Sequence, residues 1–363
     1  MKILLTDACY KHSLAITKYI RLYDPKIEII GTTNNKNFKN IFLYFLYKHL
    51  YSKLIFDELN NVLNDNNFDL VIPVGALSVK TVAEHKTLKK YLANLQNIEL
   101  CLNKERTMDL ARSLNIPIPK TIYIDRKKNI KNINIDFPCV IKGNSETNKI
   151  EQVEYVKNKT ELEKILGKLL KNKDIPLIVQ EYITGVGTGF FGFYQNGHLK
   201  NFYIHKRLRE YPIKGGPSTA ATTFYHHKIF EYGKKLLDKL KWNGVAMVEF
   251  KYNEKLDKLW LIEINPKFWG STELGLTAGI NFGALIIKAF KGEKVNVDLS
   301  PKSYKETKFY WPLDNDILSI LKSKKYKLLL EYFRSDYATN LCTNGLLINL
   351  FRCLVLLKKM LKK

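Results

Sequence analysis

The chain has 363 residues, of which 45% are hydrophobic and 12% aromatic, and this composition predicts a folded protein of two or three domains. Its 59 Lys and Arg residues exceed its 35 Asp and Glu residues and give a formal net charge of +24. That charge favours an anionic partner such as a nucleotide, an acidic sugar, a nucleic acid or an anionic membrane, although a lysine-rich genome would produce the same excess. No run of about 20 apolar residues predicts a membrane span.

The five cysteines are far apart, and no two of them have the CxxC spacing of a zinc or redox motif: Cys9, Cys101, Cys139, Cys342 and Cys353. This pattern is typical of a reduced, intracellular protein without a zinc site. The first residues, MKILLTDACY, become polar too soon for a signal peptide. We therefore expect a cytoplasmic protein.

Strand and helix patterns alternate through the first 100 residues. Apolar, β-prone runs predict strands at residues 2–8, 26–33 and 69–76. Helical periodicity predicts helices at residues 12–23, 42–56, 54–68 and 78–95. The alternation predicts a Rossmann-like α/β domain over residues 1–100, with a parallel sheet and helices on both faces. For the aromatic-rich segment 42–56 we expect core packing, with a membrane-facing patch as the alternative.

The pattern changes near residue 100. A helix from Asn103 should end at Asn115, before two prolines. A strand at 137–143, a helix at 159–170 and a strand at 176–183 follow. A glycine-punctuated stretch then contains Asn196–Gly197 between two β-prone runs, which predicts a hairpin. A helix at 232–242 precedes two further strands, and residues 299–363 are predicted to be mostly helical and basic.

The last two strands carry acids where a buried strand would prefer Val. They contain VAMVEFKY, with Glu249, and LWLIEIN, with Glu263 and Asn265. Side chains alternate along a strand, so Glu263 and Asn265 share a face, and a hairpin would bring Glu249 close to Glu263. Two carboxylates so placed repel each other unless a cation lies between them, and Mg²⁺ prefers such oxygen ligands. Taken alone, either glutamate fits a solvent-facing position equally well.

Two lysines stand where a nucleotide would need them. Lys104 lies in the first turn of its helix, where a bound phosphate would remove an unfavourable interaction with the helix dipole. Lys142 ends the strand FPCVIK and can reach a phosphate beyond it. Taken singly, each of the two lysines fits an ordinary surface position better than a phosphate site. The following loop, GNSETNK, offers Ser145, Thr147 and backbone N–H groups as phosphate donors, although an ordinary turn is the alternative.

The order of these motifs resembles the ATP-grasp superfamily, in particular the branch of the carbamoyl phosphate synthase large subunit and the carboxylate–amine ligases. The motifs are FPCVIKG, VQEYITG, VAMVEF and LWLIEINPKFWG, and the last is similar to the family pattern E-x-N-P-R-x-x-G. The resemblance covers about residues 1–290. It implies a two-part grasp, with subdomains at residues 101–183 and 184–298, after the N-terminal domain and before a basic helical region at 299–363.

The resemblance also implies roles for individual residues. Lys104 and Lys142 would bind the phosphates of ATP. Glu249, Glu263 and Asn265 would hold Mg²⁺, with Mn²⁺ as an alternative. Lys267, where the family has Arg, would lie near the transferred phosphoryl group. The hinge between the subdomains, with adenine bound to its backbone and to Glu181, would comprise Gln180, Glu181, Tyr182 and Ile183.

The segment HKRLREYPIKGGPSTAATT resembles the family loop near the acceptor carboxylate. Arg207 and Arg209 are therefore expected to bind the acyl phosphate or the substrate acid, because the guanidinium fork can hold two oxygens. Ser218 and Thr219 are either substrate contacts or parts of a plain turn. Three departures from the family affect rate and nucleotide preference: Lys267 replaces Arg, the loop after Lys142 has a single glycine, and the hinge lacks an obvious acid for the ribose.

The implied function is an ATP-dependent carboxylate–amine ligase that forms an amide through an acyl phosphate and releases ADP and phosphate. The first alternative is a kinase or carboxyl-phosphate former that never joins an amine. The second is a basic binding protein for nucleic acid or a membrane surface. Nucleic acid is not expected, because no nucleic-acid motif is present and the basic residues do not form one stripe with aromatics.

The acid and the amine are expected to be small molecules or glycans, and a homodimer is an open alternative to a monomer. The segment 345–363 has an apolar stretch followed by a basic end. It is too short to span a membrane, but it has the composition of a helix that lies on an anionic membrane surface. Docking on the protein body or on a second subunit is the alternative.

Overall fold

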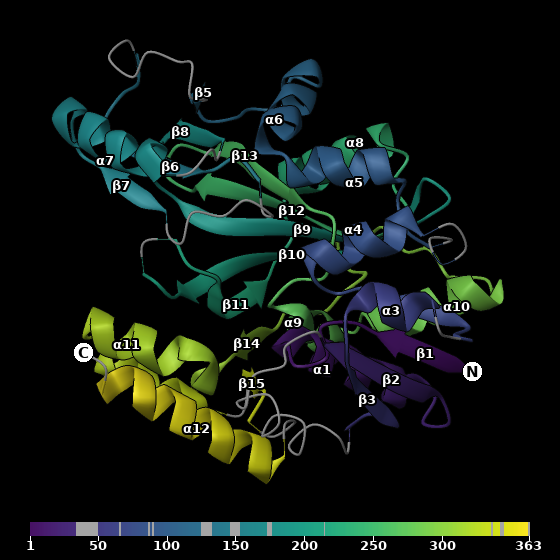
Figure 1. The fold of residues 1–363 in the computed structure, drawn as a ribbon. Helices are drawn as coiled ribbons and strands as arrows, with labels where there is room; N and C mark the ends of the chain where they lie inside the picture. Colours follow the sequence, from purple (N-terminus) through teal and green to yellow (C-terminus); the bar gives the residue numbers. More distant parts are fainter. Residues whose placement is uncertain are drawn as a thin grey trace.

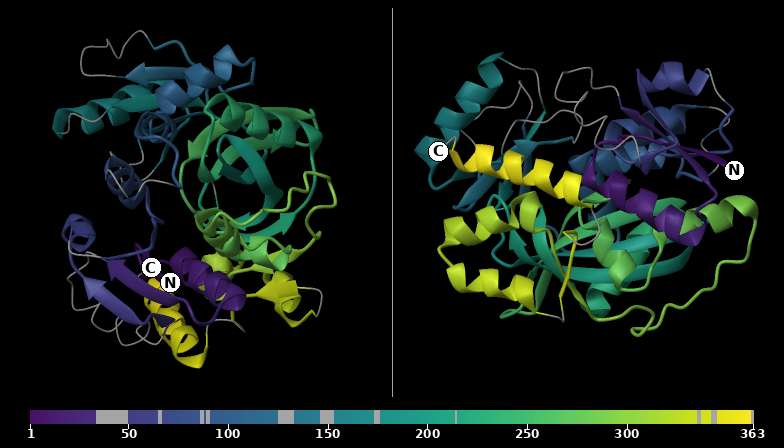
Figure 2. Two further views of the ribbon diagram at one scale, coloured as in Figure 1. Left: turned by 90° about the vertical axis from the view of Figure 1, so that its right-hand side faces the viewer. Right: turned by 90° about the horizontal axis from the view of Figure 1, so that it is seen from below.

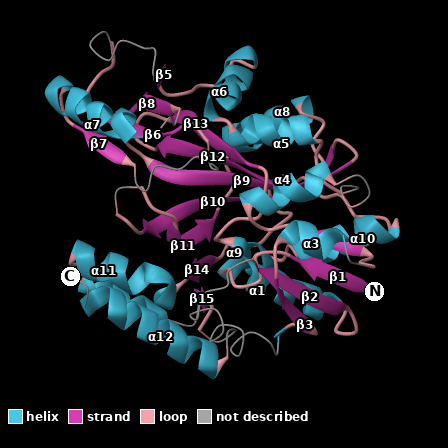
Figure 3. Cartoon of the chain, in the orientation of Figure 1, coloured by secondary structure: helices cyan, strands magenta, loops and turns pink. Residues whose placement is uncertain are grey.

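The computed structural model describes residues 1–33, 50–64, 67–85, 88, 91–124, 133–145, 153–172, 176–213, 215–334, 337–341 and 345–361. Within these residues the chain forms three sheets that lie one after another along the molecule (Figures 1 and 3). The aromatic segment 42–49 and the loop residue Thr147 lie outside the described residues.

The N-terminal sheet has four parallel strands in the order β3-β2-β1-β4, as the alternation of the sequence predicts. The strands are β1 (Lys2–Leu5), β2 (Glu28–Thr33), β3 (Lys53–Phe56) and β4 (Leu70–Ile72), and the helices are α1 (Lys11–Tyr23), α3 (Leu59–Asn64) and α4 (Ala76–Glu84). Apolar clusters cover both faces of the sheet, so it is buried on both sides.

Two helix predictions in this region are wrong. The residues Lys53–Phe56 form strand β3 instead of part of a helix, because the short apolar run Leu54–Phe56 fits a strand as well as a helix. The predicted helix 78–95 ends at Glu84, and a new helix, α5 (Leu95–Leu102), begins after Asn94. Asn94 caps α5 by accepting a hydrogen bond from the Asn97 amide at 2.8 Å, which explains the new start.

The second sheet is antiparallel, with the order β5-β8-β6-β7. Its strands are β5 (Thr121–Ile124), β6 (Cys139–Gly143), β7 (Glu154–Val156) and β8 (Leu177–Glu181), and α7 (Lys159–Asn172) covers one face. Helix α6 (Lys104–Ser113) leads into this sheet. It ends near Asn115, as predicted, and Asn115 has a left-handed φ of 54°.

The third sheet has seven strands in the order β13-β12-β9-β10-β11-β14-β15. They are β9 (Val186–Gln195), β10 (His198–Glu210), β11 (Ser218–Thr223), β12 (Gly244–Asn253), β13 (Lys258–Asn265), β14 (Lys308–Tyr310) and β15 (Tyr337–Thr339). Asn196 and Gly197 have φ values of 53° and 79° and form the predicted tight turn between β9 and β10. Helices α8 (His227–Lys239), α9 (Thr272–Thr277) and α10 (Phe282–Lys291) pack around this sheet.

The region after residue 298 is helical only in part, because β14 and β15 extend the large sheet. The remaining elements form what we call the C-terminal layer: η3 (Pro312–Asp316), α11 (Ile317–Ser323), η4 (Tyr326–Phe333) and α12 (Leu346–Leu361). Figure 1 shows this layer at the end of the large sheet that is opposite the antiparallel sheet. Among the described residues, no helix combines the length and apolarity needed to cross a bilayer.

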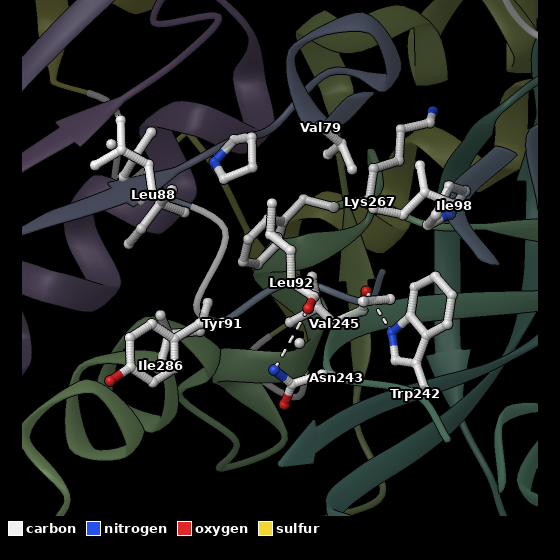
Figure 4. A pocket seen from close by; sticks show the side chains of 17 residues that line it. Val79, Leu88, Tyr91, Leu92, Ile98, Trp242, Asn243, Val245, Lys267 and Ile286 are labelled. Carbon is white, nitrogen blue, oxygen red and sulfur yellow. Dashed lines mark hydrogen bonds between the residues drawn. The ribbon is translucent and has the colours of Figure 1, made fainter. Parts of the chain in front are cut away.

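A continuous apolar core joins the N-terminal sheet to the seven-stranded sheet. A small cavity of about 30 Å³ at this junction is lined by residues of both, including Val79, Tyr91, Trp242 and Ile286 (Figure 4). The indole Nε1 of Trp242 donates to the Val245 carbonyl at 3.2 Å. The two sheets are therefore held together mainly by apolar packing, which fixes the N-terminal sheet relative to the strands that carry the acids.

Candidate functional site

The site is built on the hairpin of β12 and β13. Glu249 lies directly opposite Glu263 in the antiparallel register, as the sequence predicts. Asn265 is two residues beyond Glu263 on the same face, and its Nδ2 donates to Glu263 Oε1 at 2.9 Å. The two glutamates, called the carboxylate pair below, and the side-chain amide of Asn265 therefore bring their oxygen atoms together on one face of the hairpin.

Two lysines lie near the carboxylate pair: Lys104 at the start of α6 and Lys142 in β6. Asn103 caps α6 by accepting from the Arg106 amide at 3.1 Å, and the Lys104 amide donates to the Asn144 carbonyl at 2.8 Å. This second bond fastens the end of β6 to the start of α6, so the two lysines lie together. Lys104 Nζ is 3.3 Å from Glu263 Oε2. The predicted phosphate lysines thus face the predicted metal ligands.

Burial and charge shift the pKa values of this group. Burial alone would raise the pKa of Glu263, but Lys104, Lys142 and the hydrogen bond from Asn265 outweigh it and lower the pKa to about 2. Burial, with Lys104 nearby, lowers the pKa of Lys142 to about 8. The charged form of Lys142 is therefore destabilised by the loss of hydration. A bound anion would stabilise it.

Arg207 of β10 reaches Glu249 across strand β9. Its Nη2 is 2.6 Å from Glu249 Oε1, and its Nη1 donates to the Gly216 carbonyl at 3.2 Å. Gly187 of β9 lies beneath the arginine, where an added Cβ would stand 2.8 Å from Arg207 Cδ. The Nε of Arg207 is buried and has no hydrogen-bond partner among the described residues. Arg207 therefore binds Glu249 through Nη2 and keeps its Nε–H donor unused among the described residues.

Burial raises the pKa of Glu249, and the neighbouring Glu263 adds to the rise, while Arg207 opposes it. The pair thus holds one carboxyl with a raised pKa and one with a lowered pKa, as expected for like charges in contact. A divalent cation between them would favour the ionised form of both.

The donor set fits Mg²⁺ in its chemistry. In the described part of the chain, no three His, Cys, Asp or Glu side chains gather into a metal-binding group. Two carboxylates and one amide oxygen are too few to enclose a metal, but they suit Mg²⁺, which usually keeps water and substrate phosphate oxygens among its ligands. The cations Lys104, Lys142 and Arg207 surround the pair, so an anionic group carrying the ion would meet positive charge on three sides.

Arg209 is turned away from this group. Its Nε and Nη2 donate to the two carboxylate oxygens of Asp316 at 2.8 and 2.7 Å, and its Nη1 is 2.7 Å from Glu331 Oε2. Thr219 and Tyr332 also donate to the buried Asp316 carboxylate. In this arrangement Arg209 binds the C-terminal layer, and Arg207 is the arginine that lies at the carboxylate pair.

The hinge residues lie at the end of β8. Gln180 is buried and its Nε2 donates to Thr121 Oγ1 at 2.8 Å. The amides of Glu181 and Tyr182 donate to the carbonyls of Lys120 and Pro138, and the Glu181 carboxylate accepts from the Lys120 amide at 3.1 Å. These groups are engaged within the protein, so a contact between adenine and Glu181 stays a prediction. Ile183 is buried where the chain passes towards β9.

Sequence reasoning missed a second group of polar residues. A cavity of about 310 Å³ at the carboxyl ends of β1 and β2 is lined by Asp7, His12, Thr32, Asp57 and Lys267, among others. Burial, with Lys11 and Lys267 nearby, lowers the pKa of His12 to about 3. Within the part of the chain that the structure describes, His12 Nδ1 and Thr32 Oγ1 are buried and find no hydrogen-bond partner. The sequence did contain a usable signal for this cavity. Ligands of parallel α/β sheets bind at the carboxyl ends of the strands, and that rule would have pointed to the residues that follow β1 and β2.

Three comparisons place these residues among known proteins. A family model described as "ATP-grasp in the biosynthetic pathway with Ter operon" matches residues 195–308, which contain Arg207, Glu249, Glu263, Asn265 and Lys267. A D-alanine–D-alanine ligase of Wolbachia pipientis wMel is 28% identical over 210 residues, covering 52% of this chain and 64% of the relative. The chain thus spans less than two thirds of the curated relatives that it matches.

Solved structures share the fold. N5-carboxyaminoimidazole synthetase from Staphylococcus aureus, complexed with ADP, superposes with a TM-score of 0.68 at 12% identity, covering 90% of this chain and 86% of that one. Biotin carboxylase from Campylobacter jejuni superposes with a TM-score of 0.65 at 13% identity, covering 84% and 73%. At such identities the likeness shows the fold alone.

Proposed function

We propose that this chain is an ATP-grasp ligase that uses ATP to join a carboxylate to an amine and releases ADP and phosphate. The observation that carries the proposal is the directly paired Glu249 and Glu263, faced by Lys104, Lys142 and Arg207. A buried site with this arrangement suits a metal-bound polyphosphate, and phosphoryl transfer to a substrate carboxylate requires no nucleophilic side chain of the protein.

In the proposed reaction, an oxygen of the substrate carboxylate attacks the γ-phosphorus of ATP, and the bond to the β-phosphate oxygen breaks to release ADP. The amine nitrogen then attacks the acyl carbon, phosphate leaves, and the nitrogen gives up a proton as the amide forms. Glu249, Glu263 and Asn265 would hold Mg²⁺, which offsets charge on the phosphates when bound. Mn²⁺ would suit the same oxygen ligands.

The cationic residues position and neutralise the reacting groups. Lys104 and Lys142 would bind the phosphates, and Arg207 would hold the acyl phosphate through its free Nε. The hinge of Gln180, Glu181, Tyr182 and Ile183 would take the adenine. Lys267 lines the N-terminal cavity, so we place a substrate there, with Lys267 between it and the phosphates.

We propose a cytoplasmic enzyme whose substrates are small molecules or glycans. Asp7, Asp57 and neutral His12 in the N-terminal cavity suit the amine better than the acid, because two carboxylates would repel an anion. This placement would leave the acid near Arg207 and Lys267.

The test is a screen of acids and amines for ADP release, with AMP measured in parallel. We expect one acid–amine pair to give ADP, phosphate and an amide detected by mass spectrometry. Hydroxylamine added in place of the amine should trap the acyl phosphate as a hydroxamate. Acid-dependent ADP release without any amide would instead identify a carboxyl-phosphate former, and AMP formation would contradict the acyl-phosphate route.

A further inference from the structure

Helix α12 is amphipathic, but its apolar stripe points away from the protein. A helix turns about 100° per residue, so leucines spaced by three or four residues share one side. Five leucines do so here, with exposed fractions of 75, 52, 62, 51 and 86%: Leu346, Leu350, Leu354, Leu357 and Leu361. We call them the leucine stripe. Single exposed leucines are ordinary on a protein surface, whereas a continuous row of them marks a contact surface.

The opposite face of α12 is firmly attached to the protein. Ile348, Arg352 and Leu356 are buried there. Arg352 Nη1 lies 2.7 Å from Asp314 Oδ2, and Lys359 Nζ donates to Asn315 Oδ1 at 2.7 Å. Figure 2, right, shows α12 lying across the side of the molecule that is seen from below. The helix is therefore held in an orientation that leaves the leucine stripe outside.

The surroundings of the leucine stripe are strongly basic. Residues 317–363 contain ten Lys and Arg residues against two acids. Lys358 is exposed between Leu357 and Leu361 on α12, and the preceding elements of the C-terminal layer, α11 and η4 with the turn between them, expose Lys322, Lys324, Lys325 and Lys327. No acidic residue occurs within α12. A partner for this face must accept apolar side chains and supply negative charge.

We propose that the leucine stripe docks on the surface of a phospholipid bilayer that contains anionic lipids. The leucines would enter the boundary between headgroups and acyl chains, and the surrounding lysines would lie among the lipid phosphates. A second copy of the chain is a poorer occupant, because each copy has a net charge of +24 and the two lysine-flanked faces would repel each other.

The test is co-sedimentation of the full chain with vesicles of phosphatidylcholine, with and without phosphatidylglycerol. We expect binding to the mixed vesicles that weakens as salt is added. The double substitution Leu350→Glu/Leu354→Glu should lower the affinity at least about tenfold, since it removes apolar contact and adds like charge to an anionic surface. A matched control is Leu22→Glu/Leu256→Glu, at leucines of α1 and the β12–β13 turn that are 71% and 61% exposed.

The control should bind as the native chain does, and thermal unfolding should show that both variants are folded. If the glutamate variant unfolds, Leu350→Ser/Leu354→Ser makes the same test without added charge. The proposal is wrong if the native chain does not bind the mixed vesicles, or if the stripe variants bind them as tightly as the native chain does. It is also wrong if light scattering shows that these variants convert a dimer to a monomer while vesicle binding is unchanged.

Discussion

Replacing Glu263 by Gln tests the carboxylate pair most directly, because it removes one charge and keeps the shape of the side chain. The pKa of Glu263 falls from 4.5 to about 2 in the folded chain. At 1.36 kcal/mol per unit, this shift corresponds to about 3 kcal/mol of stabilisation of the ionised form. The side chain remains 23% exposed, so solvent screening reduces the expected loss to about 2 kcal/mol.

The sign of the pH dependence follows from the depressed pKa. The contribution of Glu263 is fully present above pH 4.5 and is lost as the pH falls from 4.5 towards 2. Denaturant unfolding should therefore separate Glu263→Gln from the native chain at pH 7, and the two should converge in acid. A suitable control is Glu254→Gln, at an exposed acid paired with Lys206 at 3.1 Å, which should change stability little.

The same variant should lose metal-dependent ADP release at least about a thousandfold, because Glu263 is a proposed ligand of the ion that neutralises the phosphates. The assay is ADP release measured against Mg²⁺ concentration. Activity within about tenfold of the native chain at saturating Mg²⁺ would refute the assignment, whatever happens to stability.

Three further substitutions separate the roles of the surrounding residues. The pKa of Lys142 is about 8, so the affinity for ATP, measured by calorimetry, should fall about tenfold between about pH 7 and pH 9. The substitution Lys142→Arg should remove this pH dependence, and an equal fall in both proteins would show that Lys142 does not bind the phosphates. Gly187→Ala should displace Arg207 and lower the rate of ADP release about tenfold or more. The control Gly167→Ala, whose added Cβ meets nothing within 4 Å, should not change the rate, and equal rates for the two variants would contradict the role of the contact between Gly187 and Arg207. Asp316→Asn should reduce the unfolding free energy by about 3 kcal/mol and leave ATP affinity unchanged, and a large loss of affinity would give Arg209 a direct role.

The carboxylate pair could be predicted from sequence because two strong local patterns agree. Alternation along β13 places Glu263 and Asn265 on one face, and the short turn after β12 leaves little freedom in how Glu249 meets them. The position of Lys104 followed from the start of its helix after Asn103, which the structure confirms.

The different partners of Arg207 and Arg209 could not be predicted from the sequence in the same way. Simple alternation would put both on one face of β10, but the register with β11 shifts between them: Arg207 pairs with Ala221 and Arg209 with Ala220. A bulge redirects the side chains that follow it, and nothing in the residues RLR indicates one. The acids that hold Arg209, Asp316 and Glu331, lie more than 100 residues away and carry no local signal.

The ion pair between Arg209 and Asp316 attaches strand β10 to the C-terminal layer. Only Leu208 separates Arg209, which the C-terminal layer binds, from Arg207, which contacts Glu249. A chain cut before Pro312 would leave the Arg209 guanidinium without either carboxylate, and β10 would lose one of its attachments in the intact protein. When Asp316 alone is replaced, Glu331 still pairs with Arg209, so loss of the whole C-terminal layer is needed to release β10 beside Arg207.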